Sequence, residues 1–204
     1  MDSTSLGSVK RRDNFKADNS LPKTWYAINE DSYKGSDFDR GHNYPSGDRT
    51  SFEEANSSTF LMTNMIPQAP ENNQQTWERL EDYTRSLVRD GKNEAYIIMG
   101  SYGSGGTGRN GYLSAINTNG VQINVPSHVW KVVVIIPNGS DDLNRINTNT
   151  RVIAVDTPNE NSINRDWKIY RTSVHAIEMT TGYNLLTNLP PPVRITLQSK
   201  VDNL

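Results

Sequence analysis

Helical and strand-like spacings of hydrophobic residues are mixed along this chain. The clearest helical pattern runs over residues 77–89, where apolar side chains recur every three or four positions and Gly91 follows as a C-terminal signal. Shorter helices are predicted over residues 53–60 and 174–180, and the run Pro190-Pro191-Pro192 is expected to act as a stop after the last helix. Helices are therefore expected in three separate parts of the chain.

Runs of β-branched residues predict strands in the second half of the chain. Asn119-Gly120 and Asn138-Gly139 lie between these runs and are typical turn signals. The helices and strands do not alternate regularly, which favours an α+β fold over a parallel, doubly wound α/β sheet. The strands are predicted over residues 95–99, 122–125, 129–136 and 151–155.

The first third of the chain has a weaker pattern. Residues 1–24 are polar and are expected to form an extended arm with little regular structure. A short strand is predicted around residues 38–42, residues 60–62 are expected to enter the core, and a polar loop is predicted over residues 67–73. No linker or internal repeat is visible, so we expect a single domain over residues 1–204.

The composition excludes several classes of protein and bears on the partners. There is no cysteine, which excludes disulfide scaffolds, thiolate zinc sites and cysteine nucleophiles. No stretch approaches the roughly 18 apolar residues of a membrane helix, so no membrane partner is expected. The first six residues lack the basic and apolar segments of a signal peptide. The formal net charge is -2, so any recognition of phosphate must come from a local cluster of arginines.

Two features that are typical of cofactor or metal sites have plainer explanations. The segment Gly103-x-Gly105-x-x-Gly108 matches a dinucleotide-binding pattern, but no helix follows it and no acidic residue lies about 20 positions further on. We therefore expect a flexible hairpin loop there. His128 and His175 lie beside apolar residues without a second histidine at metal-binding spacing, and they are expected to be surface or core histidines.

The segment Asp39-Arg40-Gly41-His42 is the first candidate for chemistry. On an extended backbone, Arg40 and His42 lie on the same face. The permanent charge of Arg40 is expected to lower the pKa of His42 and so keep the ring neutral, as a general base requires. A surface turn is an equally good interpretation of this segment when it is taken alone.

The second candidate lies at and along the predicted helix. Asn73, Trp77, Glu81 and Arg85 recur at four-residue intervals and are expected to form one stripe. An ion pair between Glu81 and Arg85 in solvent would explain the last two residues. The stripe also suits a metal site that cuts phosphodiesters, because one amide oxygen and a water-mediated carboxylate suffice to hold Mg²⁺.

Several segments have the order and spacing of a known family's motifs. In these segments the chain resembles the DNA/RNA non-specific endonuclease family of the ββα-metal (His-Me finger) superfamily, and it is most similar to the family's cyanobacterial member. The resemblance implies an α+β fold with a central, mainly antiparallel sheet flanked by helices. The segments are Asp39-Arg40-Gly41-His42, Thr63-Asn64-Met65-Ile66-Pro67-Gln68, Asn72-Asn73-x-x-x-Trp77-x-x-Leu80-Glu81-Asp82, Thr150-Arg151-Val152-Ile153-Ala154-Val155 and Thr181-Gly182-Tyr183.

The resemblance implies roles for the residues of the catalytic centre. His42 is implied to be the general base that deprotonates the attacking water. Asn73 is implied to be the only direct protein ligand of a Mg²⁺ or Mn²⁺ ion, while Glu81 holds metal-bound waters. Arg11 and Arg85 match family positions that contact the phosphate of the substrate.

Three neighbouring residues receive supporting roles from the same resemblance. Arg40 is implied to add catalytic positive charge and a phosphate contact at the edge of the site. Asn64 is implied to support the geometry around His42 and Asn73. Asp39 is expected to be structural and to fix the strand by bonding to backbone groups.

The function implied by the resemblance is that of a sugar-nonspecific endonuclease. It would cut single- and double-stranded DNA and RNA to 5′-phosphate and 3′-hydroxyl ends, largely without regard to sequence because phosphate encodes none. Family members are commonly secreted or periplasmic, and a protein inhibitor is a candidate partner. The family's domain begins with a tryptophan-bearing strand to which nothing here corresponds, so an exposed sheet edge or core face is expected.

Two other functions fit the same residues. The first is a nucleic-acid-binding or inhibitor-binding fragment that keeps the site without turnover, which metal-dependent cleavage by the purified protein would exclude. The second is a phosphodiesterase or nucleotide pyrophosphatase that acts on small substrates. Such an enzyme would prefer a dinucleotide to a polymer.

Overall fold

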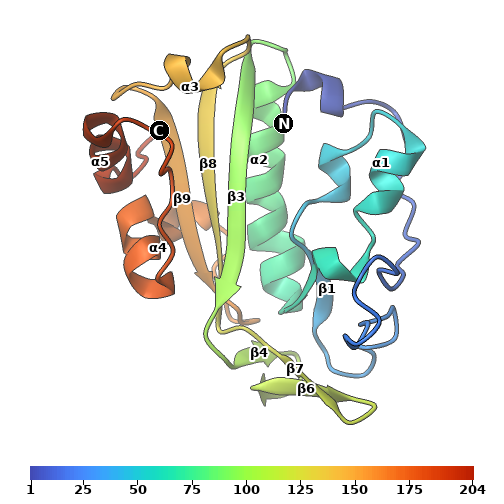
Figure 1. The fold of residues 1–204 in the computed structure, drawn as a ribbon. Coiled ribbons are helices and arrows are strands. Elements are labelled where there is room, and N and C mark those ends of the chain that lie inside the picture. The colour runs from blue at the N-terminus through green and yellow to red at the C-terminus, as the bar shows by residue number, and fades with distance from the viewer.

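A four-stranded antiparallel sheet lies at the centre of the computed structural model, which describes residues 1–204. The strand order is β10-β9-β8-β3, so β8 and β9 are internal strands and β3 lies at an edge (Figure 1). Three of the four predicted strands, over residues 95–99, 129–136 and 151–155, are confirmed in this sheet, and the fourth, over residues 122–125, lies in a separate hairpin. Their bounds are Asn93–Tyr102 for β3, His128–Pro137 for β8, Arg151–Pro158 for β9 and Arg171–Thr172 for β10.

Helices cover both faces of the central sheet, and β8 divides the core between them. Helix α2 lies on one face, and α4 and α5 lie on the other (Figure 1). Along β8, Trp130 and Val132 pack with the residues of α4 and α5, whereas Val129 and Val133 pack with those of α2. This alternation is the two-residue period of a strand that is buried on both faces. The helices span Glu78–Val88 for α2, Val174–Thr181 for α4 and Pro191–Ser199 for α5.

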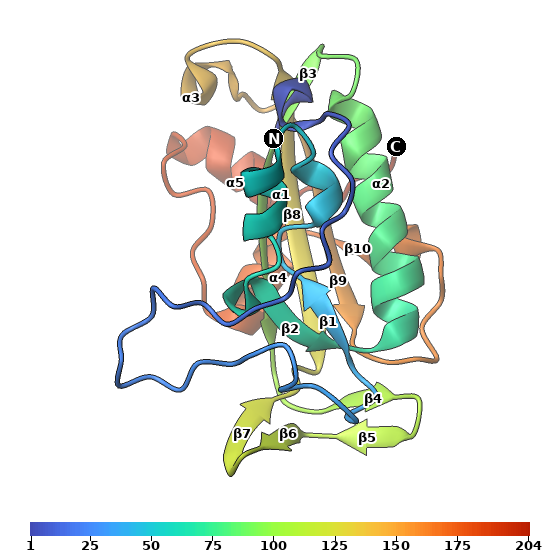
Figure 2. The ribbon, with the colours of Figure 1, turned by 90° about the vertical axis from the view of Figure 1, so that its right-hand side faces the viewer.

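A smaller β1–β2 pair leads directly into α2 and gives a ββα arrangement. Strand β1, Asp39–His42, pairs antiparallel with β2, Met65–Gln68, and Figure 2 shows the two strands side by side. Gly41 allows this close approach, because a Cβ at that position would lie 2.3 Å from Gln68 Oε1. Helix α1, Glu53–Ser58, lies between the two strands in sequence. The predicted strand at residues 38–42 is therefore confirmed.

The prediction of a polar loop over residues 67–73 is wrong for most of that segment. Pro67 lies in β2, and the helical conformation begins at Pro70. Both prolines occupy tolerated positions, since β2 is an edge strand and the first turn of a helix has no partner for its N–H groups. From Asn72 to Trp77 the chain forms a π-helical turn, which continues into α2.

Two of the turn and stop signals act differently from the prediction. Pro191 and Pro192 were expected to mark the stop after the last helix, but they begin helix α5. The fixed φ of proline suits the first helical positions. Asn138-Gly139 does not form a tight hairpin. It opens a longer connection between β8 and β9 that contains α3, Asp142–Arg145, and the Arg145 guanidinium bonds to the Pro137 carbonyl.

Two small hairpins lie beyond one end of the central sheet (Figure 2). The glycine-rich segment forms the first hairpin, which confirms the hairpin prediction. Asn119-Gly120 turns the second with φ values of 50° and 81°, which residues other than glycine and asparagine rarely adopt. The hairpin strands are β4 Gly106–Gly108, β5 Gly111–Leu113, β6 Ala115–Thr118 and β7 Val121–Asn124.

The N-terminal arm follows the surface, and its first residue touches the edge of the sheet. Met1 exchanges two backbone hydrogen bonds of 2.7 Å with Ala95 on the outer edge of β3. The arm otherwise contains a 3₁₀ turn and one isolated β-bridge, between Lys16 and Leu61, so it has little regular structure, in agreement with the prediction. None of the helices combines the length and the apolar character needed to cross a lipid bilayer. The 3₁₀ turns are Ser3–Ser5, Ser46–Asp48, Met62–Asn64 and Trp167–Tyr170.

The buried side chain of Asn159 joins β2 to the end of the central sheet. It accepts a hydrogen bond from the Ala69 N–H (2.6 Å) and donates to the carbonyls of Pro67 (3.0 Å) and Pro126 (2.8 Å). Asn159 is 1% exposed, so water cannot replace these bonds. One side chain therefore fixes the segment that runs into the π-helical turn.

Replacing Asn159 with alanine is expected to destabilise the folded chain by at least about 3 kcal/mol, because it removes the partner of three backbone groups and each one left unpaired costs about 1–3 kcal/mol. Urea unfolding followed by tryptophan fluorescence measures this change. Asn124→Ala is the control, since Asn124 is exposed and makes one bond to the Gly103 carbonyl. Equal effects of the two substitutions would contradict the assignment.

Candidate active site

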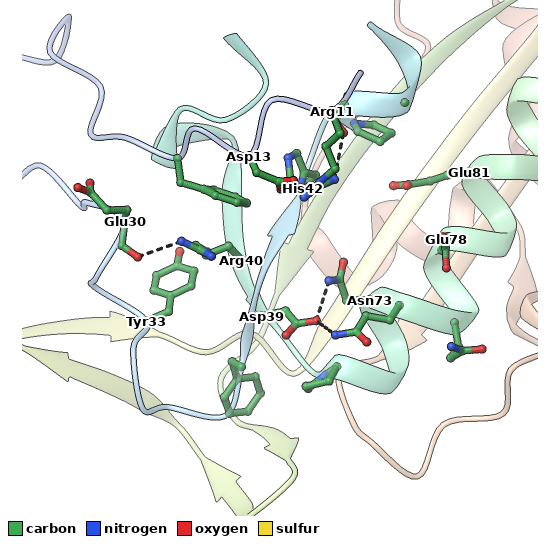
Figure 3. Close-up of a pocket in the computed structure, with 18 of the residues that line it drawn as sticks. Arg11, Asp13, Glu30, Tyr33, Asp39, Arg40, His42, Asn73, Glu78 and Glu81 are labelled. Atoms are coloured by element: carbon green, nitrogen blue, oxygen red, sulfur yellow. Dashed lines mark hydrogen bonds and ion pairs between the residues drawn. The ribbon is translucent and has the colours of Figure 1, made fainter. Parts of the chain in front are cut away.

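A polar cleft of about 1320 Å³ lies between the N-terminal arm, β1 and the start of the helix. Six of the seven residues proposed from the sequence as catalytic, metal-binding or phosphate-binding line it, although they are spread over more than 70 positions of the chain. Figure 3 shows His42 and Arg11 on one side, with Asn73 and Glu81 facing them from the helix. The six are Arg11, Arg40, His42, Asn73, Glu81 and Arg85.

His42 lies at the end of β1 and is enclosed by aromatic rings. Its ring meets those of Phe15 and Phe60 edge-on, with centroids 5.7 Å and 5.1 Å away. Nε2 is buried without a hydrogen-bond partner, which leaves Nδ1 as the ring nitrogen available to the cleft. Burial lowers the pKa of His42 to about 4, and the charge of Arg11 adds to this effect.

The expected cause of the low His42 pKa therefore needs correction. Arg40 contributes less than burial and Arg11, and Asp13 acts in the opposite direction. The geometric part of the prediction is confirmed. The Arg40 guanidinium lies 3.8 Å from the centroid of the Phe15 ring that His42 also contacts, so the two side chains share one face of β1.

The carboxylate of Asp39 orients the amide of Asn73. Asp39 Oδ2 accepts hydrogen bonds from Asn73 Nδ2 (2.9 Å) and Gln74 Nε2 (2.7 Å), as the dashed lines in Figure 3 show. Because Nδ2 is fixed in this way, Asn73 Oδ1 is left to accept from or bind another group. The expectation that Asp39 bonds to backbone groups is wrong, since its recorded partners are these side-chain amides.

The π-helical turn changes which side chains share the cleft face of the helix. The predicted stripe included Trp77, but Trp77 is 1% exposed and packs in the core with α2. In a π turn the hydrogen bonds link residues five apart, so Glu78 follows Asn73 on the same side. Glu78 lines the cleft, and a stripe counted only in steps of four misses it, although it lies three residues before Glu81 on α2.

Glu81 pairs with a buried lysine from the central sheet and not with Arg85, the partner that the alternative interpretation of the stripe gave it. Lys131 Nζ lies 3.2 Å from Glu81 Oε1 and 4.6 Å from the centroid of the Trp77 ring. The side chains of Lys131 and Glu81 are 2% and 12% exposed. Burial raises the pKa of Glu81, and the positive charge of Lys131 opposes the rise.

Arg85 is held by two aspartates. Its Nη1 lies 2.5 Å from Oδ1 of the buried Asp48, and its Nη2 pairs with the exposed Asp82. Arg85 therefore does not pair with Glu81, because Asp48 approaches it from the segment that follows His42. Arg85 still lines the cleft, with 13% of its side chain exposed.

The other two arginines are also fixed by short contacts. Arg11 donates from Nε to Asp13 Oδ1 (2.6 Å) and from Nη1 to Ser46 Oγ (3.0 Å). Arg40 donates to the Glu30 carbonyl (3.2 Å) while it stacks on Phe15. The cleft therefore contains the local arginine cluster that a chain of nearly balanced charge needs for phosphate recognition.

Asn64 lies behind the cleft and does not line it. It accepts a hydrogen bond from the Tyr44 N–H (2.9 Å) and donates to the carbonyls of Tyr44 (2.9 Å) and Thr59 (2.8 Å). These bonds fix the loop that follows His42, so support for His42 agrees with the prediction. No hydrogen bond joins Asn64 to Asn73, so the predicted support for Asn73 and the catalytic role of Asn64 stay predictions.

Lys131 and Asp48 were not identified from the sequence, although the position of Lys131 in the sequence is unusual. Lys131 stands inside the run Val129–Ile136 of apolar residues, and a lysine within a buried strand requires a partner. That partner, Glu81, is 50 positions away and could not be identified from spacing. Asp48 has no comparable signal, because it lies in a polar turn where aspartate is ordinary.

The side chains at the start of the helix suit a hard divalent cation. Asn73 Oδ1 is available as one neutral oxygen ligand, and the carboxylates of Glu78 and Glu81 face the same cleft. No group of three or more His, Cys, Asp or Glu side chains converges on one point. This donor set fits an ion that keeps most of its water, as Mg²⁺ does, better than one enclosed by protein ligands.

The His42 ring is expected to titrate with a midpoint near pH 4, as its pKa indicates, instead of near 6.5. Arg11→Ala should raise the midpoint by removing a positive charge. Because the unfolded chain binds this proton more readily, the stability linked to His42 is complete above pH 6.5 and is lost as pH falls towards 4. NMR titration, with His42→Gln to assign the signal, tests this. A midpoint near 6.5 would show that the ring is not enclosed.

Comparison with known proteins places the chain in a family. The sequence profile of the DNA/RNA non-specific endonucleases matches residues 1–191. A nuclease of Nostoc sp. is 45% identical over 203 residues, which are 100% of this chain and 70% of that protein. Human mitochondrial endonuclease G is 34% identical over 128 residues, 62% of this chain and 42% of that protein.

A solved structure agrees with the arrangement of strands and helices. The structure of EndoG in its complex with EndoGI superposes with a TM-score of 0.70 and covers 92% of this chain and 75% of that chain. The sequences are 23% identical, so this likeness concerns the fold. The chain therefore belongs to the DNA/RNA non-specific endonuclease family and has the ββα-metal nuclease fold.

Proposed function

We propose that this chain hydrolyses phosphodiester bonds of both DNA and RNA with one divalent cation and with His42 as the general base. The observation that carries the proposal is the enclosed, neutral ring of His42 facing the same cleft as Asn73 and Glu81. A base, a site for a cation and four arginines, among them Arg11, Arg40 and Arg85, then surround one space large enough for a nucleotide backbone.

His42 takes the proton of the attacking water at Nδ1. The water oxygen forms a bond to phosphorus while the bond from phosphorus to the 3′-oxygen breaks. The 3′-oxygen takes a proton from solvent water, which gives 5′-phosphate and 3′-hydroxyl ends. A pKa near 4 keeps the ring neutral at pH 7, so it is ready to accept the proton. General base catalysis of this kind contributes about 10²–10⁴-fold to the rate.

The helix start supplies the proposed cation site. Asn73 Oδ1 is the proposed direct ligand, and Asp39 keeps that oxygen turned into the cleft. Glu81, which pairs with Lys131, is proposed to bind through water. A bound Mg²⁺ or Mn²⁺ would neutralise the charge that grows on the phosphate and on the leaving oxygen.

The arginines are proposed to recognise the phosphate. Arg11 and Arg85 contact the scissile group, and Arg40 adds positive charge beside it. Contacts to phosphate carry no sequence information, so cleavage should be largely independent of sequence. A protein inhibitor is proposed as a further partner, on the likeness to the structure of EndoG bound to EndoGI.

The purified chain is expected to degrade supercoiled plasmid in Mg²⁺ or Mn²⁺ but not in EDTA. His42→Ala should lower the rate by about 10²–10⁴-fold, since it removes the base. His175→Ala is the matched control, because His175 is exposed on α4, outside the cleft. Cleavage that survives in His42→Ala would mean that another group is the base.

Asn73→Ala is expected to raise the Mg²⁺ or Mn²⁺ concentration that gives half-maximal activity, because it removes the proposed direct ligand. Binding of Mn²⁺ measured by electron paramagnetic resonance should weaken in parallel. Gln74→Ala is the control, since Gln74 donates to the same Asp39 oxygen without being a proposed ligand. If both variants weaken Mn²⁺ binding equally, the orientation of Asp39 matters and Asn73 is not the ligand.

DNA and RNA oligonucleotides of equal length and sequence are expected to be cut at rates of similar order. The reason is that the proposed contacts go to phosphate and none of them needs a 2′-hydroxyl group. Gel assays under one set of salt and metal conditions make the comparison. Strict rejection of either sugar would contradict the proposed substrate range, and a preference for a dinucleotide would favour a small-substrate phosphodiesterase.

A further inference from the structure

The turn Ser46–Asp48, which follows His42 by four residues, contacts both arginines that are proposed to bind the scissile phosphate. Arg11 Nη1 donates to Ser46 Oγ at 3.0 Å, and Arg85 Nη1 lies 2.5 Å from Asp48 Oδ1. Arg11 comes from the N-terminal arm and Arg85 from α2. The turn therefore links the two arginines, because each of them bonds to one of its side chains.

Asp48 and Asp82 pair with the same guanidinium but differ in burial. The side chain of Asp48 is 2% exposed, whereas that of Asp82 is 67% exposed. Removing a carboxylate from water is costly unless it is paired, so Asp48 cannot easily leave Arg85. Asp82 is solvated and bonds to the other terminal nitrogen, Nη2, from which a phosphate oxygen could displace it at little cost.

Gly47 provides the space in which Arg85 lies. A Cβ at this position would be 2.7 Å from Arg85 Nη1 and 3.0 Å from Cζ. Any larger residue would therefore move the guanidinium or the turn. The backbone of the turn thus sets the position of Arg85 together with the carboxylate of Asp48.

Asn56 holds the turn and ties it to the arm beside Arg11. Its Nδ2 donates to the carbonyls of Ser46 (2.8 Å) and Arg49 (3.0 Å), and its Oδ1 accepts from the Arg12 N–H (3.1 Å). Asn56 is fully buried, so all three bonds are protected from water. The arm, the turn and, through Asp48, the helix are joined in one network.

We propose that Asp48 is a positioning residue for Arg85, and that the Ser46–Asp48 turn sets where Arg11 and Arg85 meet the phosphate. Asp82 occupies the place of a phosphate oxygen until the substrate binds. The inference rests on the proposed function, because it takes these arginines as phosphate contacts. Its physical basis is that charges fixed before the reaction stabilise a transition state without the cost of ordering long side chains.

A double-mutant cycle on Asp48 and Arg85 tests the proposal with an oligonucleotide substrate in Mg²⁺. Asp48→Asn should lower kcat/KM by about tenfold to a hundredfold, since a displacement near 1 Å can have that effect. In an Arg85→Ala background the same substitution should change kcat/KM by less than about twofold, because its target is gone. Asp48→Asn and Arg85→Ala should each reduce the slope of log kcat/KM against log salt by about one phosphate contact.

Asp82→Asn is the matched control, since it removes the other carboxylate from the same guanidinium. It is expected to keep or raise kcat/KM, because it removes a competitor of the phosphate. If Asp82→Asn costs as much as Asp48→Asn, or if Asp48→Asn acts equally with and without Arg85, the positioning role is wrong. Circular dichroism and the melting temperature of each variant show whether it is folded.

A second cycle keeps the test decisive if Asp48→Asn does not fold. Ser46→Ala leaves the charges unchanged and removes only the hydroxyl that accepts from Arg11. It should lower kcat/KM in the wild type but not in an Arg11→Ala background, and additivity would overturn the proposal. Failure of the proposed function looks different, because the wild-type chain would then show no cleavage that depends on metal and on His42.

Discussion

The carboxylate of Asp39 joins the strand that carries the base to the helix start that carries the proposed metal ligand. It belongs to β1, three residues before His42, and it accepts from the amides of Asn73 and Gln74. Gly41 lets β1 lie against Gln68 in β2, so the strand cannot drift from the helix that β2 runs into. The distance between base and helix is thereby set by backbone pairing, and the direction of the Asn73 oxygen by one hydrogen-bonded carboxylate.

Buried charges then connect the core to the cleft. Lys131 is inside the central sheet, yet its ammonium reaches Glu81, and Asp48 is inside the turn, yet its carboxylate reaches Arg85. Burying an ion costs several kcal/mol unless a partner offsets it, so such pairs are weak devices for stability alone. Both pairs fix a side chain that faces the cleft. Their positions are explained if the cleft needs charges that stay in place.

The elements that could be predicted from the sequence are those with a local period. Residues 77–89 and 129–136 have enough apolar residues at helical or strand spacing to identify both elements. The shared face of Arg40 and His42 followed from an extended backbone alone. Proline was less informative, because the residue that stops a helix also begins one, as Pro191 does.

The features that could not be predicted depend on contacts between distant residues or on an irregular turn. The π turn at Asn72–Trp77 shifts the helix phase, so that Asn73 shares a side with Glu78 and not with the buried Trp77. The partner of Glu81 lies on β8, and the partner of Arg85 lies near β1. Family motifs brought the six cleft residues together without revealing what holds them, because a motif records which residues occur and not what they touch.

The source of the low His42 pKa separates the tuning of the base from the binding of phosphate. Had Arg40 been the main cause, salt would screen that charge and would weaken the base and the substrate contacts together. Burial between Phe15 and Phe60 is the main cause instead, and mobile ions do not screen it. Salt should therefore act through the arginine contacts to phosphate while His42 stays neutral. A chain with almost no net charge can thus be a nuclease. The pKa of its base depends on packing, and only the binding of the substrate phosphate depends on charge.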